Sequence, residues 1–359
     1  MTRIHNFNAG PAALPLPVLE RAQAELLEYN AQGMSIMEMS HRSKAYEAIV
    51  NGAIANIRQL MGVPDEYQVL FLQGGASLQF ATIPMNLRRP GEVADYVDTG
   101  SWASKAIKEA KLQGETKVIW SDKPGNYTRA PRPDELTFTP GAAYVHICSN
   151  ETIGGVRFAG FPKTEAPLIA DMSSEIMSRA IDVSQFGMIY AGAQKNIGPS
   201  GLALVIIRKD LIARTPDTVP VFLRYDTHAN ENSLYNTPNT WGIYFVKLVT
   251  DHMLAQGGVP AYQRMNEAKA NALYDVLDSS DFWTPHAAKD SRSIMNVTWR
   301  LPSEELEARF AAEAKKAGLE GLKGHRSVGG LRASIYNAVT MADVQALIAF
   351  MQEFEQQNG

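Results

Sequence analysis

Seven short apolar runs, most of them separated by helical or turn segments, constrain the fold of this chain more than any other feature. The runs cover residues 68–72, 93–98, 117–120, 143–148, 167–171, 188–193 and 202–208, and helical patterns at 77–87 and 101–112 fall between some of them. Apolar strands that alternate with helices are typical of a mostly parallel sheet covered on both faces. We therefore predict an α/β protein with a roughly seven-stranded sheet, whose ligands bind at the carboxyl ends of the strands.

The rest of the chain predicts further helices and a second, smaller unit. Helical patterns cover residues 17–32, 46–60, 244–255 and 303–317, and another long helix follows Gly257-Gly258-Val-Pro260 and runs to about residue 277. Strand-like patterns cover 293–301 and 330–335. A last helix opens at Thr340 with Asp343 three residues later, which resembles a capping box. Residues 215–242 are polar and predict a long loop. We expect a large domain of residues 16–255 and a small α+β domain of residues 1–15 and 256–359.

Composition excludes several functional classes. A net charge of −4 gives no general attraction to nucleic acid or to an anionic membrane. Because Cys148 is the single cysteine, neither an intrachain disulfide nor a zinc site of several thiolates can form. The N-terminus lacks the apolar region of a secretory signal, and no stretch reaches the ~18 apolar residues of a membrane span. We therefore expect a cytoplasmic protein.

One lysine occupies an unusual position. Lys195 follows the apolar run 188–193 and precedes the turn Asn-Ile-Gly-Pro-Ser-Gly. A lysine in a poorly solvated pocket loses its proton more easily and becomes a nucleophilic amine, as Schiff-base enzymes require. The alternative is a strand-end lysine whose ammonium reaches water.

Three other strand ends carry residues suited to a phosphorylated, aromatic cofactor. Gln73-Gly-Gly-Ala-Ser77 lies between a strand and a helix, where free backbone N–H groups can hold a phosphate, although it can also be a plain turn. Asp171 ends the run 167–171 and can either cap a turn or oppose a positively charged ring nitrogen. Trp102 follows another strand and can stack on a flat ring or lie in the core.

The absence of several known motifs argues against most other enzyme classes. The chain contains no Walker loop, GxGxxG, HExxH or G-x-S-x-G motif, and its seven histidines show no metal-ligand spacing, so we expect no metal site. Two His-Arg pairs, His41-Arg42 and His325-Arg326, stand out in a net acidic protein, with Arg332 shortly after the second pair. Guanidinium groups bind carboxylate and phosphate through paired hydrogen bonds, so these residues favour an anionic small molecule.

Taken together, these motifs resemble those of the pyridoxal phosphate-dependent aminotransferases with the aspartate-aminotransferase fold, class V, and within them the phosphoserine aminotransferase family. The matching segments are residues 6–12, 39–42, 73–77, 100–102, 149–152, 171–174, 192–201, 235–238, 324–326 and 329–337. The lysine segment Gly-Ala-Gln-Lys-Asn-Ile-Gly-Pro-Ser-Gly and the last segment are specific, whereas the Gly-Gly turn alone is weak.

The resemblance implies a role for each site residue. Lys195 would form the Schiff base with pyridoxal 5'-phosphate and then carry a proton between the substrate α-carbon and the cofactor. Asp171 would pair with the ring nitrogen, Trp102 would stack on the ring and Thr152 would contact the ring hydroxyl. Ala76, Ser77 and Gln194 would hold the cofactor phosphate, with Asn236 and Thr237 from the other subunit of a homodimer. Arg332 would bind the α-carboxylate, and the acidic arm of the substrate would be held by His41, Arg42, His325 and Arg326.

The implied reaction is transamination between L-glutamate and 3-phosphohydroxypyruvate in serine biosynthesis, with a related phosphohydroxythreonine pair of pyridoxal phosphate biosynthesis as a second substrate. Some family members carry arginine at the position of Ser77, which leaves open how the substrate phosphate is held here. The alternatives are an alanine–glyoxylate type transaminase, a cysteine desulfurase, and a regulator that binds the cofactor without turnover.

Overall fold

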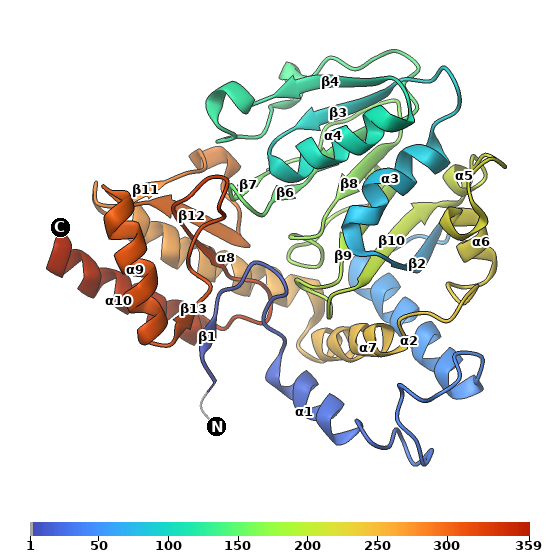
Figure 1. Cartoon of the computed structure of the whole chain (residues 1–359), viewed down its shortest axis with the longest axis horizontal. Helices are drawn as coiled ribbons and strands as arrows, with labels where there is room; N and C mark the ends of the chain where they lie inside the picture. Colours follow the sequence, from blue (N-terminus) through green and yellow to red (C-terminus); the bar gives the residue numbers. More distant parts are fainter. Residues whose placement is uncertain (1–2) are drawn as a thin grey trace.

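The computed structural model describes residues 3–359, and its centre is a seven-stranded sheet (Figure 1). In spatial order the strands are β2 (Tyr67–Gln73), β10 (Leu202–Arg208), β9 (Met188–Gly192), β8 (Leu168–Asp171), β5 (Val145–Cys148), β3 (Ala94–Asp98) and β4 (Thr116–Ser121). Only β10 runs antiparallel to its neighbours within this sheet, and the other pairs are parallel. The predicted fold class and all seven predicted strands are confirmed.

Helices cover both faces of the sheet because successive strand residues point to opposite sides. On β2, Val69 and Phe71 join one buried apolar cluster, whereas Leu70 and Leu72 join another. The first cluster contains side chains of α1 (Leu16–Ala24), α2 (Lys44–Met61) and α7 (Thr240–Ala255). The second contains side chains of α3 (Gly75–Leu87), α4 (Ser101–Gln113), α5 (Lys209–Ile212) and α6 (Tyr225–Asn230).

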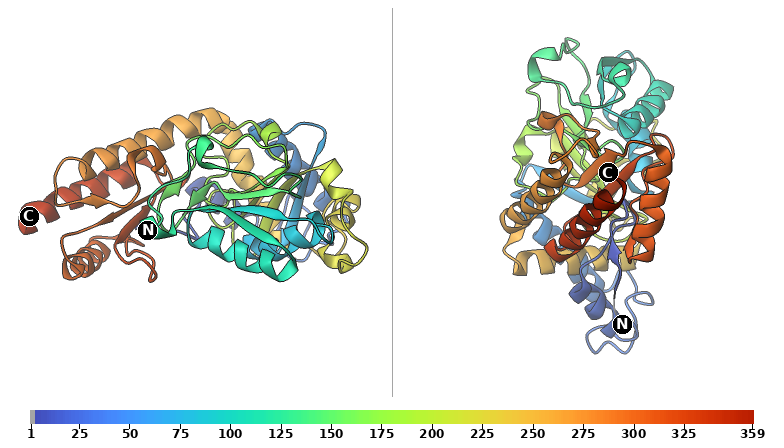
Figure 2. Two further views of the ribbon diagram at one scale, coloured as in Figure 1. Left: turned by 90° about the horizontal axis from the view of Figure 1, so that it is seen from above. Right: turned by 90° about the vertical axis from the view of Figure 1, so that its left-hand side faces the viewer.

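A third apolar cluster forms the C-terminal end of the molecule, shown in orange to red in Figure 2. It joins α8 (Gly258–Leu277), α9 (Glu304–Lys316) and α10 (Met341–Asn358) to an antiparallel sheet of β11 (Thr284–Pro285), β12 (Asn296–Arg300) and β14 (Leu331–Ser334). The N-terminal strand β1 (His5–Asn6) pairs with β13 (Leu319–Glu320). Since α8 contributes side chains to two clusters, the domain boundary after residue 255 stays a prediction.

Two local predictions are wrong. The helix expected over residues 17–32 ends at Ala24, because the chain then turns and places Asn30 and Ala31 in the left-handed backbone region. The long loop expected over 215–242 contains α6, which is held by the buried side chains of Tyr225 and His228. The capping box at Thr340 and Asp343 is confirmed by hydrogen bonds in both directions.

The C-terminal unit contacts the carboxyl edge of the large sheet through the turn after β5. This turn contains the two-stranded ribbon of β6 (Asn150–Glu151) and β7 (Val156–Arg157). Asn150 donates to Asn296 of β12 at 2.9 Å, and Thr298 donates to the carbonyl of Gly154 at 2.7 Å. The edge that should bind ligands therefore lies between the two units. Within residues 3–359, none of the helices has both the length and the apolar character that a membrane crossing requires.

Candidate active site

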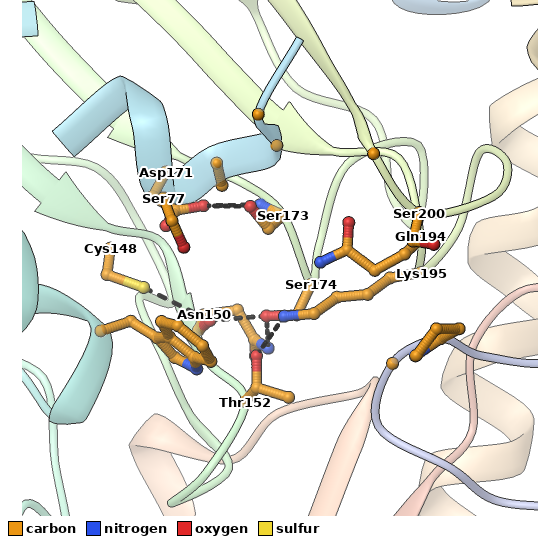
Figure 3. Close-up of a pocket in the computed structure, with 17 residues that line it drawn as sticks. Ser77, Cys148, Asn150, Thr152, Asp171, Ser173, Ser174, Gln194, Lys195 and Ser200 are labelled. Atoms are coloured by element: carbon orange, nitrogen blue, oxygen red, sulfur yellow. Dashed lines mark hydrogen bonds between the residues drawn. The ribbon is translucent and has the colours of Figure 1, made fainter. Parts of the chain in front are cut away.

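A cavity of about 300 Å³ lies at the carboxyl edge of the large sheet (Figure 3). Its wall includes the first residues of α3 and α4 and the ends of β5 and β8, together with the turn after β9. Seven predicted cofactor residues line it together: Ala76, Ser77, Trp102, Thr152, Asp171, Gln194 and Lys195. These residues come from five separate segments, so the topology of the sheet brings them into one site.

Lys195 is buried in this cavity, with 6% of its surface exposed. Its Nζ donates a hydrogen bond of 2.5 Å to Oγ1 of Thr152 and lies 5.7 Å from the centre of the Trp102 ring. Burial lowers the pKa of Lys195 to about 8, although the nearby charge of Asp171 opposes this shift. A substantial share of the amine is therefore neutral, and so nucleophilic, a little above neutral pH.

Asp171 presents a buried carboxylate to the same cavity. Its Oδ1 accepts hydrogen bonds from the backbone N–H and the hydroxyl of Ser173, at 2.9 and 2.6 Å. The Ser173 hydroxyl oxygen also accepts the N–H of Gly192, which ties the end of β8 to the end of β9. Burial raises the pKa of Asp171, so a cationic group in the cavity would stabilise its charged form.

The start of α3 forms an anion cradle. Gly74 and Gly75 have φ of +81° and +61°, a backbone region that favours glycine, and a Cβ on Gly74 would lie 2.7 Å from Leu78. Gly74 caps the helix without a side-chain hydrogen bond, so the first N–H groups of α3 are left for a ligand. A helix N-terminus of this kind favours phosphate.

Sequence reasoning missed Glu151, which holds Trp102 in position. Its carboxylate accepts the backbone N–H groups of Trp102 and Ala103 at 3.1 and 2.8 Å, and a Cβ on Gly100 would lie 2.5 Å from its Cδ. Burial raises the pKa of Glu151 to about 7. The sequence signal that could have identified Glu151 is a charged residue between Asn150 and Thr152, immediately after a buried strand.

The predicted substrate residues lie outside this cavity. Arg332 is buried beside it, and its Nη1 donates at 3.5 Å to the carbonyl oxygen of Thr152, which lines the cavity. His325 and Arg326 occupy a loop next to β14, and His41 and Arg42 precede α2. Asn236 and Thr237 do not line the cavity either, although the Thr237 carbonyl accepts a hydrogen bond from Gln73.

The residues in the cavity fit pyridoxal 5'-phosphate. The α3 cradle matches its phosphate, the Asp171 carboxylate matches its ring nitrogen and the Lys195 amine matches its aldehyde. Trp102 adds an aromatic face, and its buried Nε1 has no hydrogen-bond partner among residues 3–359. The chemistry of these donors and acceptors therefore agrees with the cofactor that the sequence motifs predict.

Comparisons with known proteins agree with this reading. The family model for Aminotransferase class-V matches residues 4–347. The chain is 56% identical to a phosphoserine aminotransferase of Geobacillus kaustophilus over 99% of both proteins. Its fold matches the phosphoserine aminotransferase of Bacillus circulans subsp. alkalophilus with a TM-score of 0.98, at 55% identity over 99% of both chains. A PLP-bound phosphoserine aminotransferase from Trichomonas vaginalis matches with a TM-score of 0.94 at 38% identity, over 98% of this chain and 100% of that one.

The burial of Lys195 leads to a testable titration. In the cofactor-free protein, its amine should become reactive with a midpoint near pH 8, since burial lowers the pKa to about 8. Lys289, whose side chain is 81% exposed, is the internal control for a solvent-accessible lysine. Competitive acetylation followed by peptide mass spectrometry measures both residues in one sample. A midpoint for Lys195 at the ordinary lysine value of about 10.4 would contradict the account.

Proposed function

The chain belongs to the class-V aminotransferase family, and we propose that it acts as a phosphoserine aminotransferase in serine biosynthesis. It moves the amino group between L-glutamate and 3-phosphohydroxypyruvate, giving O-phospho-L-serine and 2-oxoglutarate. The observation that carries the proposal is the meeting of Lys195, Asp171 and the α3 cradle in one cavity. The cofactor is pyridoxal 5'-phosphate, which supplies an electrophilic carbon and an electron sink when bound.

Residues that line the cavity would bind the cofactor and move the proton. The first N–H groups of α3, with Ser77 and Gln194, would hold the cofactor phosphate. Asp171 would keep the ring nitrogen protonated, since its buried carboxylate is stabilised by a cation. The Lys195 Nζ would take the proton from the substrate α-carbon, and its bond to Thr152 keeps it directed into the cavity before substrate binds.

Five basic residues would bind the anionic groups of the substrates. Arg332 would hold the α-carboxylate, because its guanidinium is buried beside Thr152 at the border of the cavity. His41, Arg42, His325 and Arg326 would hold the acidic arm, which is a phosphate in one substrate and a carboxylate in the other. Because this chain has Ser77 where some family members have arginine, these four residues alone would bind the substrate phosphate.

The phosphate preference separates this proposal from an alanine–glyoxylate type transaminase. We expect kcat/KM to be at least about a hundredfold higher for 3-phosphohydroxypyruvate than for hydroxypyruvate, because each charge-assisted hydrogen bond to phosphate is worth about 1.5–3 kcal/mol. Steady-state rates with L-glutamate as the amino donor measure the ratio. Equal efficiency with the two oxo acids would overturn the phosphate assignment. Activity on phosphohydroxythreonine, as a second substrate, can be measured in the same assay.

A cysteine desulfurase is disfavoured by the setting of Cys148. Its thiol is buried at the end of β5 and donates to the Asn150 carbonyl at 3.5 Å. Burial raises the pKa of Cys148 well above its usual value, so the reactive thiolate is scarce.

A homodimer with shared active sites completes the proposal. It is supported by the position of Arg42 and Asn236, which do not line the cavity of their own chain within residues 3–359. A segment with large exposed apolar side chains also precedes α2: Leu27, Met34 and Met37 are 85%, 41% and 57% exposed. Covering these side chains with a second copy would remove apolar surface from water.

Subunit mixing tests the shared site. Lys195→Ala and Arg42→Ala homodimers should each lose most activity, because each lacks one essential group in both sites. After dissociation and random reassociation, half of the dimers are mixed, and each mixed dimer regains one intact site if the two residues come from different chains. The mixture should therefore recover about a quarter of wild-type activity. Recovery of none, with mixed dimers confirmed by mass spectrometry, would show that Lys195 and Arg42 serve the same site within one chain.

A further inference from the structure

The loop that carries His325 and Arg326 is thinly supported by the rest of the protein. It is a hairpin that begins at Gly324, and the N–H of Gly324 donates to the Gly330 carbonyl at 2.8 Å. A β-bridge between Lys323 and Leu331 pairs the two arms just outside it. Cavities of about 270 and 510 Å³ lie against the hairpin, and both are lined in part by its residues. Apolar packing therefore does little to fix where the hairpin lies.

Two polar side chains connect this hairpin to the body of the C-terminal unit. Arg300, at the end of β12, donates from Nη1 to the Val328 carbonyl at 2.8 Å. Glu307, in the first turn of α9, accepts the N–H of Gly330 on Oε2 at 3.1 Å. The two side chains also bind each other, with Arg300 Nε 2.6 Å from Glu307 Oε1.

The glycines of the hairpin are fitted to this pair. Gly329 and Gly330 have φ of +69° and +70°, and a Cβ on Gly330 would lie 2.8 Å from Arg300 Cδ. Glu307 is 7% exposed and its Oε1 also receives the N–H of Leu301 at 3.3 Å, so its position is set by both strand and helix. Glu307 is therefore a fixed point to which both Arg300 and the hairpin are bound.

Arg332 is held separately from the hairpin. It lies in β14, pairs with Thr298 of β12, and donates its backbone N–H to the Leu322 carbonyl at 2.8 Å. Loss of the support should thus displace His325 and Arg326 while the α-carboxylate site is kept.

We propose that Arg300 and Glu307 are positioning residues that hold the hairpin of residues 324–330 where His325 and Arg326 bind the phosphate arm of the substrate. The inference rests on the proposed function, because it takes this arm to be a phosphate. Neither residue touches the substrate. They act by keeping the hairpin in one position before substrate arrives, which lowers the ordering cost of binding.

The test compares two carboxylates that face the same guanidinium. Glu307→Gln removes the supporting charge, whereas Glu304→Gln is the matched control, since Glu304 is 92% exposed and 3.8 Å from Arg300. In the holoenzyme, Glu307→Gln should raise the KM for 3-phosphohydroxypyruvate about tenfold with kcat within about twofold of wild type, because Lys195 and Asp171 are untouched. Glu304→Gln should match wild type.

Hydrogen–deuterium exchange of the unliganded holoenzymes gives a readout that is independent of turnover. Exchange in residues 324–330 should accelerate at least about tenfold in Glu307→Gln, and it should be unchanged in β14 and in Glu304→Gln. Arg300→Lys keeps the charge but loses the planar guanidinium that binds the Val328 carbonyl and Glu307 together. This variant should show the same pattern, and it serves as the second test if Glu307→Gln folds poorly. Wild-type KM and exchange in both Glu307→Gln and Arg300→Lys would overturn the inference. If the wild-type enzyme used hydroxypyruvate and 3-phosphohydroxypyruvate equally well, the proposed function would be contradicted. The exchange measurement would still test whether Arg300 and Glu307 hold the hairpin.

Discussion

The burial of one amine is the constraint on which the active site depends. Removing the Lys195 ammonium from water is unfavourable, and its bond to the Thr152 hydroxyl offsets only part of that cost. The result is a lysine with a lowered pKa that is ready to react with an aldehyde. Asp171 limits the shift because its charge lies in the same cavity. The two groups thus adjust each other's pKa, and a bound cofactor would place its ring nitrogen at Asp171 and its aldehyde at Lys195.

The sheet topology explains why these groups meet. Asp171 ends β8 and pairs with Tyr190 of β9, so the turn that carries Lys195 leaves the sheet beside it. The α3 cradle follows β2, and β2 pairs with the side of β10 that faces away from β9. Glu151 then fixes Trp102 from a third strand end through two backbone hydrogen bonds. These contacts join segments far apart in the sequence, and the shared edge of the sheet places all of them around one cavity.

The sequence predicted most of the fold because the apolar runs and their punctuation are local signals. It also located Lys195, Asp171 and Trp102 at strand ends, where position in the chain already implies position in space. It did not predict the support of Glu307 for Gly330, because residues 23 positions apart meet only through tertiary packing. Likewise, the end of α1 at Ala24 depends on left-handed residues that helical periodicity does not reveal.

The central claim is that this cavity performs a transaminase half-reaction. Adding L-glutamate alone to the holoenzyme and recording the visible spectrum tests it most directly. The account predicts that the cofactor absorbance changes to that of the amine form, that one equivalent of 2-oxoglutarate is released per site, and that 3-phosphohydroxypyruvate restores the starting spectrum. An unchanged spectrum, with glutamate bound, would contradict the account and favour a cofactor-binding regulator.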